Sequence, residues 1–288
     1  VIGVQLPMGP FETGLPKLAE ALSDSREAAT DAAKGIMTTD TVSKECTAIF
    51  EIDGVSYAIG GMSKGSGMIQ PNMATMLAVL TTDAAVEKGA LKQALKAAVD
   101  HSFNKITVDS DTSTNDSCFC LANGAAEGPV IEVGSEAFEV FAAALRAVCE
   151  NLARKMAADG EGATKLVTVN ITGAASDEDA DKAARTIANS PLVKTAIAGH
   201  DCNWGRIAAA LGRSGAAFEQ ENVDIDIMGM PVLRGGLPCG FDEDEALKRF
   251  EQDEIVIDVE MGAGSCSTRM WTCDFTHDYI SINADYRS

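Results

Sequence analysis

A single threonine, Thr75, lies where a glycine-rich turn runs into an apolar stretch. The turn contains Lys64-Gly65-Ser66-Gly67 and Pro71-Asn72, and the apolar stretch continues through Leu80. Glycine permits backbone conformations that other residues resist, so a strained peptide can form just before the threonine. Attack of the Thr75 hydroxyl on the Ala74 carbonyl would cleave the chain and free the Thr75 α-amine. That amine can act as the base for its own hydroxyl, so the segment predicts a threonine nucleophile that needs no histidine.

A plainer interpretation treats Thr75 as a buried strand residue after an ordinary loop. A phosphate-binding loop is excluded, because Lys64 precedes the glycines and the order G-x-x-x-x-G-K-[ST] is absent. The polar run 109–116 does not fit a calcium-binding EF-hand loop, which would need glycine at Thr114 and glutamate at Cys120. Such a run is more typical of turns whose side chains bond to the backbone.

Two further loops carry candidate polar groups. Residues 159–164 contain Glu161, which is either an exposed acid in the turn that ends a helix or a carboxylate that faces a pocket. Residues 200–206 favour a helix start with Asn203 as the N-cap. A catalytic pair of His200 and Cys202 is the alternative, although side chains so close in sequence rarely point together.

The elements that must position these groups alternate between helices and strands. Apolar spacing predicts helices at residues 15–33, 84–100, 137–157 and 177–188. Strands are predicted at residues 47–59 (a hairpin that turns at Asp53-Gly54), 106–108, 166–171, 223–227, 255–259, 269–275 and 279–282. The pattern predicts an α/β fold with mixed sheets sandwiched by helices, and a smaller β-rich lobe from about residue 220.

Charge and composition exclude several classes of function. The 288 residues carry a formal net charge of −20, which repels nucleic acid and anionic lipid. No apolar run reaches the ~18 residues of a membrane span, and Val1 is not followed by the basic region of a signal peptide. The eight cysteines form no C-x-x-C pair, which indicates reduced thiols, and no zinc, other metal or cofactor is predicted.

Taken together, these stretches resemble the ornithine acetyltransferase family, the bifunctional glutamate N-acetyltransferases of arginine biosynthesis. The resemblance is specific and runs in order through the whole chain. It is carried by residues 64–69, 71–77, 109–116, 159–166, 203–207 and 282–288.

The resemblance implies self-cleavage between Ala74 and Thr75, followed by acetyl transfer through an acetyl-Thr75 intermediate. N-acetylornithine would donate the acetyl group and glutamate would accept it, with acetyl-CoA as a second donor in many members. Residues 1–74 would end an α chain and residues 75–288 would form a β chain, assembled as α2β2. The family pattern implies six substrate-binding residues, namely Thr38, Lys64, Thr75, Glu161, Asn283 and Ser288.

By the same resemblance, the enzyme would be cytoplasmic in a bacterium and would work in the mitochondrion or plastid of a eukaryote. A Thr-Gly pair that polarises the acetyl carbonyl in the family would lie upstream of Val1, so an N-terminally truncated chain is expected. Cys202 replaces a usual proline and Ser288 a common threonine. Two alternatives stay open: an N-terminal-nucleophile amidase or aminopeptidase that gives the acyl group to water, and a catalytically impaired fragment.

Overall fold

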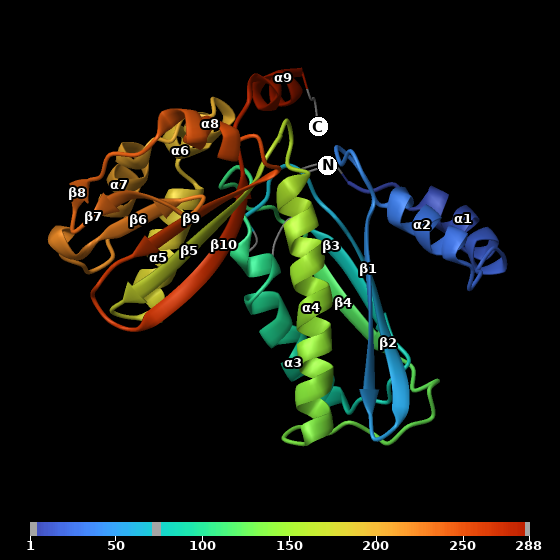
Figure 1. Ribbon diagram of the computed structural model, residues 1–288. Helices are drawn as coiled ribbons and strands as arrows, with labels where there is room; N and C mark the ends of the chain where they lie inside the picture. Colours follow the sequence, from blue (N-terminus) through green and yellow to red (C-terminus); the bar gives the residue numbers. More distant parts are fainter. Residues whose placement is uncertain (1–4, 71–75, 286–288) are drawn as a thin grey trace.

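Two β-sheets stand on either side of one long helix in the computed structural model, which describes residues 5–70 and 76–285 (Figure 1). That helix, α4 (Glu136–Ala158), buries the apolar positions that the sequence places three or four residues apart. Its N-cap is Ser135 and its C-cap is Asp159, so the helix predicted at residues 137–157 is confirmed and extends one residue further at each end. None of the helices in the described ranges is both long and apolar enough to cross a membrane.

The first sheet has the strand order β1-β2-β3-β4. Its strands are β1 (Lys44–Ile52), β2 (Val55–Lys64), β3 (Leu77–Thr82) and β4 (Ser117–Ala122). Strand β2 pairs antiparallel with both β1 and β3, whereas β3 and β4 pair in parallel. The hairpin predicted at Asp53-Gly54 is confirmed, because both residues take the positive φ that this turn requires.

The second sheet has the order β10-β5-β9-β6-β7-β8. Its strands are β5 (Leu166–Ala174), β6 (Asp224–Ile227), β7 (Met230–Arg234), β8 (Leu237–Pro238), β9 (Glu254–Glu260) and β10 (Cys266–Cys273). The expected lobe boundary near residue 220 does not match this sheet. Because β9 pairs in parallel with β5, the strands after residue 220 share one sheet with a strand that begins at Leu166.

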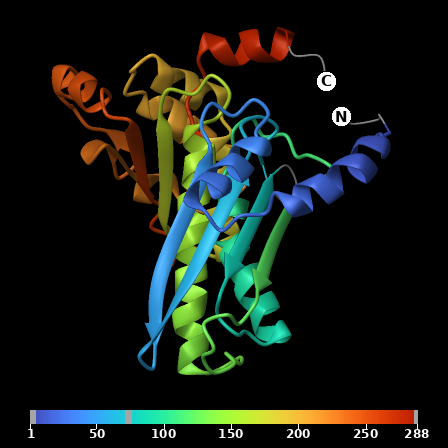
Figure 2. The same cartoon turned by 90° about the vertical axis from the view of Figure 1, so that its right-hand side faces the viewer.

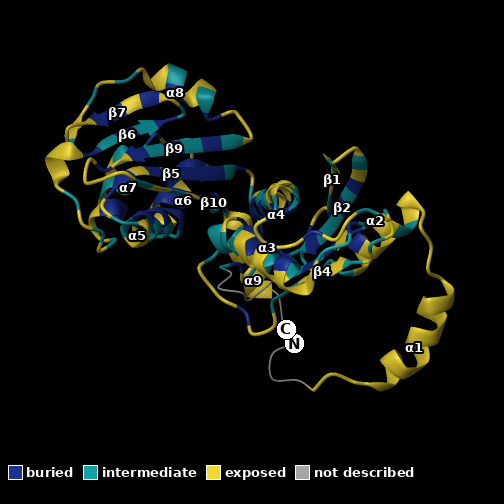
Figure 3. Cartoon of the chain, turned by 90° about the horizontal axis from the view of Figure 1, so that it is seen from below, coloured by how far each residue is buried: buried dark blue, intermediate teal, exposed yellow. Residues whose placement is uncertain are grey.

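Helices cover both faces of the first sheet and pack on the second. The remaining helices are α1 (Gly9–Glu20), α2 (Arg26–Gly35), α3 (Lys88–Asp100), α5 (Asp177–Ala188), α6 (Pro191–Ala198), α7 (Trp204–Gly212), α8 (Glu243–Arg249) and α9 (His277–Asp285), with short 3-10 turns η1 (Phe103–Lys105) and η2 (Gln220–Asn222). Helices α3 and α4 lie on one face of the first sheet and α2 on the other (Figures 2 and 3). Helices α5, α6 and α7 share a buried apolar cluster with the second sheet.

Strand β10 joins the two apolar cores, because its successive side chains point to opposite faces. Met270 packs in the core of the second sheet, whereas Trp271 packs in the core between the first sheet and α4. The Arg154 guanidinium of α4 lies 6.0 Å from the centre of the Trp271 ring. The two layers therefore meet along α4 and β10.

Three predicted elements differ in the structure. The helix expected at residues 15–33 is broken into α1 and α2, because Ser25 caps a new start by accepting a hydrogen bond from Ala28 N. The strand expected at 106–108 makes only a single bridge to Trp271. Residues 279–282 are helical, because no neighbouring strand pairs with them and α9 makes its hydrogen bonds internally.

Gly61 on β2 offers a test of how closely α4 packs on the first sheet. An added Cβ would lie 2.6 Å from Leu80 Cδ2, 3.0 Å from Leu152 Cδ1 and 3.1 Å from Val148 Cγ1. We expect Gly61→Ala to lower the free energy of unfolding by about 1–3 kcal/mol, the usual cost of overpacking. The adjacent Gly60→Ala is the control, because its Cβ meets only Thr81 Oγ1 at an ordinary 3.6 Å. Equal stability of the two variants in urea titrations would contradict this packing.

Candidate active site

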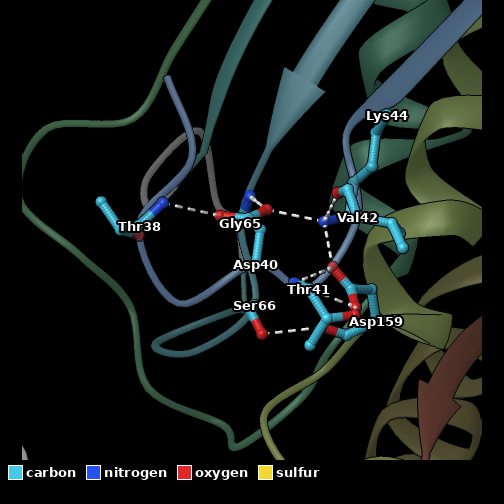
Figure 4. A network of polar contacts seen from close by, with 8 residues as sticks. All are labelled: Thr38, Asp40, Thr41, Val42, Lys44, Gly65, Ser66 and Asp159. Atoms are coloured by element: carbon cyan, nitrogen blue, oxygen red, sulfur yellow. Dashed lines mark hydrogen bonds and ion pairs between the residues drawn. The ribbon is translucent and has the colours of Figure 1, made fainter. Parts of the chain in front are cut away.

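The carboxylate of Asp40 ties three segments together at one end of the first sheet. It accepts hydrogen bonds from Gly65 N at 2.7 Å, from Thr38 N at 3.1 Å and from Lys44 Nζ at 2.6 Å (Figure 4). Burial by itself would raise the pKa of Asp40, but these donors outweigh it and hold the pKa below its ordinary value. Thr38 is thereby held beside the start of the glycine-rich segment.

Lys44 is the buried cation of this network. Its side chain has no exposed surface, and Nζ lies 2.6 Å from the Asp40 carboxylate and 2.5 Å from that of Asp159. Thr41 donates to the same Asp159 carboxylate from both its N–H and its hydroxyl. Asp159 follows α4, so the ion pairs fix the end of that helix against the beginning of β1.

The glycine-rich segment lies directly against the loop that carries Glu161. Ser66 Oγ donates to the Asp159 carbonyl at 2.7 Å, and Glu161 N donates to the Ser66 carbonyl at 3.0 Å. A Cβ on Gly67 would lie 2.4 Å from the Glu161 carboxylate. Only glycine permits this approach, which accounts for Gly67 in the motif.

Glu161 is a buried acid that no cation of the described residues neutralises. The residue is 8% exposed, and its carboxylate accepts a 2.8 Å hydrogen bond from Asn283 Nδ2 of α9. Within residues 5–70 and 76–285, no lysine or arginine forms an ion pair with it. An ammonium group of a ligand would supply the missing charge.

Lys64 carries the opposite unpaired charge. It is the last residue of β2, and it forms no ion pair in the part of the chain that the structure describes. Lys44, by contrast, is matched by two carboxylates. Lys64 and Glu161 are therefore available to a ligand that bears both a carboxylate and an ammonium group.

Asp109 fixes the other end of the glycine-rich segment. Its carboxylate accepts from Met68 N at 2.6 Å and from Ile69 N at 2.9 Å, and Met68 adopts a φ of 54°. Next to it, burial together with the carboxylates of Asp109 and Glu161 raises the pKa of Tyr279 to about 12. The tyrosine therefore stays protonated and can donate a hydrogen bond here.

The structure brings together four of the sequence-predicted site residues, namely Thr38, Lys64, Glu161 and Asn283. Ala74, Thr75 and Ser288 lie outside the described residues. Met76 and Leu77 are described, and Leu77 pairs with Lys64 in the register of β3 on β2. In the sequence, Thr75 therefore comes two residues before Leu77, the residue that pairs with Lys64 across the sheet.

Residues 200–206 do not join this site. Asn203 caps α7 by accepting from Arg206 N, which confirms the helix start. Cys202 is buried in the second core, and burial raises the pKa of its thiol to about 11. His200 packs beside the Phe250 ring instead of acting on that thiol.

Sequence reasoning missed Asp40, Lys44, Asp159 and Tyr279. Most of their roles depend on contacts between segments far apart in the sequence, as between Lys44 and Asp159. The only local signal was their position beside the recognised motifs. In the described ranges, no three metal-ligating side chains gather into a candidate metal site.

Comparison with known protein families gives one match over the whole chain. The model described as "ArgJ family" matches residues 1–288. The protein of Symbiobacterium thermophilum named "Arginine biosynthesis bifunctional protein ArgJ" is 51% identical over 288 residues, which are all of this chain and 71% of that protein. A relative of the same name from Desulfotalea psychrophila is 47% identical over all of this chain and 73% of its own length.

Two further relatives extend the comparison. The Schizosaccharomyces japonicus protein named "Arginine biosynthesis bifunctional protein ArgJ, mitochondrial" is 44% identical over all of this chain and 68% of its own length. The crystal structure of an arginine biosynthesis bifunctional protein ArgJ from Bacillus halodurans is 45% identical, with a TM-score of 0.69. It covers 72% of this chain and 97% of the solved chain.

Lys44→Met tests the buried ion pairs. Removing one partner of a buried pair leaves an uncompensated charge, so we expect a loss of about 3–5 kcal/mol in the free energy of unfolding at neutral pH. In the wild type, the lowered pKa of Asp40 contributes stability above its unfolded-state value, and this contribution is lost as pH falls through the folded-state pKa. Without Lys44, burial favours the protonated form of the Asp40 carboxyl, so the deficit should shrink at about pH 4.5.

The matched control for Lys44→Met is Lys96→Met. Lys96 pairs with Asp100 on the surface of α3, where their side chains are 73% and 41% exposed. This change should cost less than about 1 kcal/mol at either pH. Denaturant titrations measure the free energy of unfolding of both variants. Similar losses of stability in the two would show that burial does not strengthen the Lys44 contacts.

Proposed function

Because the chain belongs to the ArgJ family, it is an acyltransferase of arginine biosynthesis, and we propose that Thr75 carries the acetyl group. The reaction moves an acetyl group from N-acetylornithine to glutamate and yields ornithine and N-acetylglutamate. One observation favours Thr75 and its neighbours as the reacting centre. Lys64 and Glu161, which form no ion pair within residues 5–70 and 76–285, lie on segments that hydrogen-bond to each other through Ser66.

The proposed chemistry begins with cleavage of the Ala74–Thr75 peptide. The freed α-amine of Thr75 then accepts the hydroxyl proton as Oγ attacks the acetyl carbonyl of the donor. Ornithine leaves with a proton, and glutamate takes the acetyl group from Thr75 in a second attack.

Lys64 and Glu161 are proposed to hold the amino-acid head of each substrate. The ammonium of Lys64 suits the substrate α-carboxylate, and the carboxylate of Glu161 suits a substrate amine. Asn283 orients Glu161 through its hydrogen bond. Thr38 and Ser288 would add hydroxyl contacts to the substrates. Thr38 is exposed, and its N–H is fixed by Asp40.

The two pieces of the cleaved chain are proposed to stay together and to pair as α2β2. Strands β2 and β3 lie on opposite sides of the cleavage point and remain hydrogen-bonded neighbours in one sheet, which supports continued association.

Acetyl-CoA is proposed as a second donor. The proposed site of action is the cytoplasm of a bacterium, or the mitochondrion or plastid of a eukaryote.

Thr75→Ala in the protein expressed from its complete gene should block cleavage and acetyl transfer together, because one hydroxyl performs both attacks. Thr75→Ser should retain part of each. Denaturing electrophoresis and N-terminal sequencing report the cleavage, and mass spectrometry of the downstream chain reports an added acetyl group. A wild-type protein that transfers acetyl groups while it stays uncleaved would refute the role of Thr75.

Glu161→Gln tests recognition of the substrate amine. Leaving a charge unpaired in a buried pair costs about 2–5 kcal/mol, so the KM for N-acetylornithine should rise at least about 30-fold. Self-cleavage should persist. The control is Glu132→Gln, an exposed acid far along the chain that makes no side-chain hydrogen bond with other described residues. Normal acetylation of Thr75 by Glu161→Gln at low donor concentration would show that Glu161 does not bind the head group.

A further inference from the structure

Lys194 of α6 is a buried lysine without a carboxylate partner. The residue is 1% exposed, and within residues 5–70 and 76–285 its ammonium forms no ion pair. Its Nζ donates instead to the Thr272 hydroxyl at 2.7 Å and to the Cys273 carbonyl. Burying an ammonium is costly, and an apolar side chain of similar length would fill the same space. The ammonium therefore serves the end of β10 rather than a neighbouring acid.

The same ammonium lies against the aromatic ring that follows β10. Nζ is 4.4 Å from the centre of the Phe275 ring, a distance at which the ring attracts a cation. The backbone adds a further contact, because Phe275 N donates to the Lys194 carbonyl at 3.2 Å. Residues 272–275 are thus held to α6 by both the side chain and the backbone of one lysine.

Residues 272–275 pack against the loop that carries Glu161. A Cβ on Gly160 would lie 2.8 Å from Cys273 Sγ, so the loop backbone directly contacts this side chain. The carboxylate of Asp274 accepts from Thr164 N at 2.8 Å. The residue before Glu161 and the end of its loop are therefore both fixed by the segment that Lys194 holds.

Helix α9 takes its position from the same segment. It lies on the outside of the fold beyond the end of α4, and none of its residues 277–285 is buried (Figure 1). The Tyr279 ring stacks on the Phe275 ring, with the ring centres 4.6 Å apart. One turn further, Asn283 Nδ2 donates to the Tyr279 carbonyl at 3.0 Å and to the Glu161 carboxylate at 2.8 Å. The helix that presents Asn283 is thus linked to Lys194 through one aromatic ring.

Two acids stabilise the buried ammonium from beyond ion-pair distance. Burial lowers the pKa of Lys194, and the charges of Cys273, Asp274 and Asp109 oppose this effect. Asp274 is the anchor of the Glu161 loop, and Asp109 accepts from backbone amides of the glycine-rich segment. The ammonium is therefore coupled to the carboxylates that hold the two segments of the site.

We propose that Lys194 is a positioning residue for substrate binding and acts through Glu161. Its ammonium fixes residues 272–275, which hold the Glu161 loop on one side and α9 on the other. The Glu161 carboxylate and the Asn283 amide are thereby kept in the geometry that receives the substrate amine, so less ordering is needed when the substrate binds. The inference rests on the proposed function, in which Glu161 binds that amine.

Lys194→Met in the enzyme expressed from its complete gene is the direct test. Methionine is apolar and of similar length, and it removes the ammonium. Because a hydrogen bond to a charged group commonly contributes about one to two decades of affinity, the KM for N-acetylornithine should rise at least about 10-fold. The kcat should stay within about threefold of the wild-type value, because the reacting hydroxyl is unchanged. A fall in kcat at an unchanged KM would overturn the positioning role.

Lys105→Met is the matched control. Its ammonium also contacts β10, at the Thr268 hydroxyl 3.0 Å away, and it pairs with Asp181 at 2.6 Å, but it contacts β10 outside residues 272–275. This change should leave the KM unchanged. Hydrogen–deuterium exchange of the α9 amides should be faster in Lys194→Met than in Lys105→Met, because the contact that orders the helix is lost. Equal exchange of α9 in the two variants would overturn the link between Lys194 and this helix.

Phe275→Leu covers the case in which Lys194→Met does not fold. It keeps the lysine and an apolar side chain but removes the ring between Lys194 and Tyr279. The KM should again rise, and the two changes together should raise it by less than the product of their separate effects, because both act through one contact. A wild-type KM in Phe275→Leu would overturn the proposed path to α9.

Glu161→Gln separates a failure of this inference from a failure of the proposed function. If Glu161→Gln raises the KM while Lys194→Met and Phe275→Leu leave it unchanged, Lys194 has no positioning role and Glu161 still binds the amine. If Glu161→Gln itself leaves the KM unchanged, the proposed function of Glu161 is overturned.

Discussion

The buried ammonium of Lys44 is the contact on which the candidate site depends. It lies between the carboxylates of Asp40 and Asp159, and these two acids in turn hold the Thr38 loop, the Gly65 amide and the end of α4. Since an isolated buried charge is costly, each of the three segments must be in place for the others to be stable. The position of the glycine-rich segment therefore depends on the Thr38 loop, on β1 and on the end of α4 together.

The site contains two groups of charged residues: the ion-pair network around Lys44, and the side chains of Lys64 and Glu161. Lys44 is matched by two acids, whereas Lys64 and Glu161 form no ion pair with other described residues. Two opposite charges that are held apart and left unpaired favour a zwitterionic ligand, because the ligand supplies both counter-charges in one step. The absence of side-chain volume at Gly67 is what lets the Glu161 carboxylate approach the segment that follows Lys64.

The frame behind the site is rigid because α4 and β10 belong to both layers. Trp271 and Met270 are consecutive residues of β10, yet each lies in a different apolar core. The loop that carries Glu161 follows α4 directly, and Asp274, just after β10, accepts hydrogen bonds from Thr164 and Lys165 on the same loop. The loop is therefore anchored at both ends by the elements that join the layers.

The sequence by itself determined the local elements, the family and most of the charged site residues. The helix around Leu145, the hairpin at Asp53-Gly54 and the N-cap Asn203 follow from short-range spacing and turn chemistry, which neighbouring residues decide. Only the tertiary structure decided that Lys44 pairs with Asp159, that strands on both sides of residue 220 share one sheet, and that residues 279–282 form a helix. These outcomes depend on which segments that are distant in the sequence come into contact, and on whether a strand partner is available.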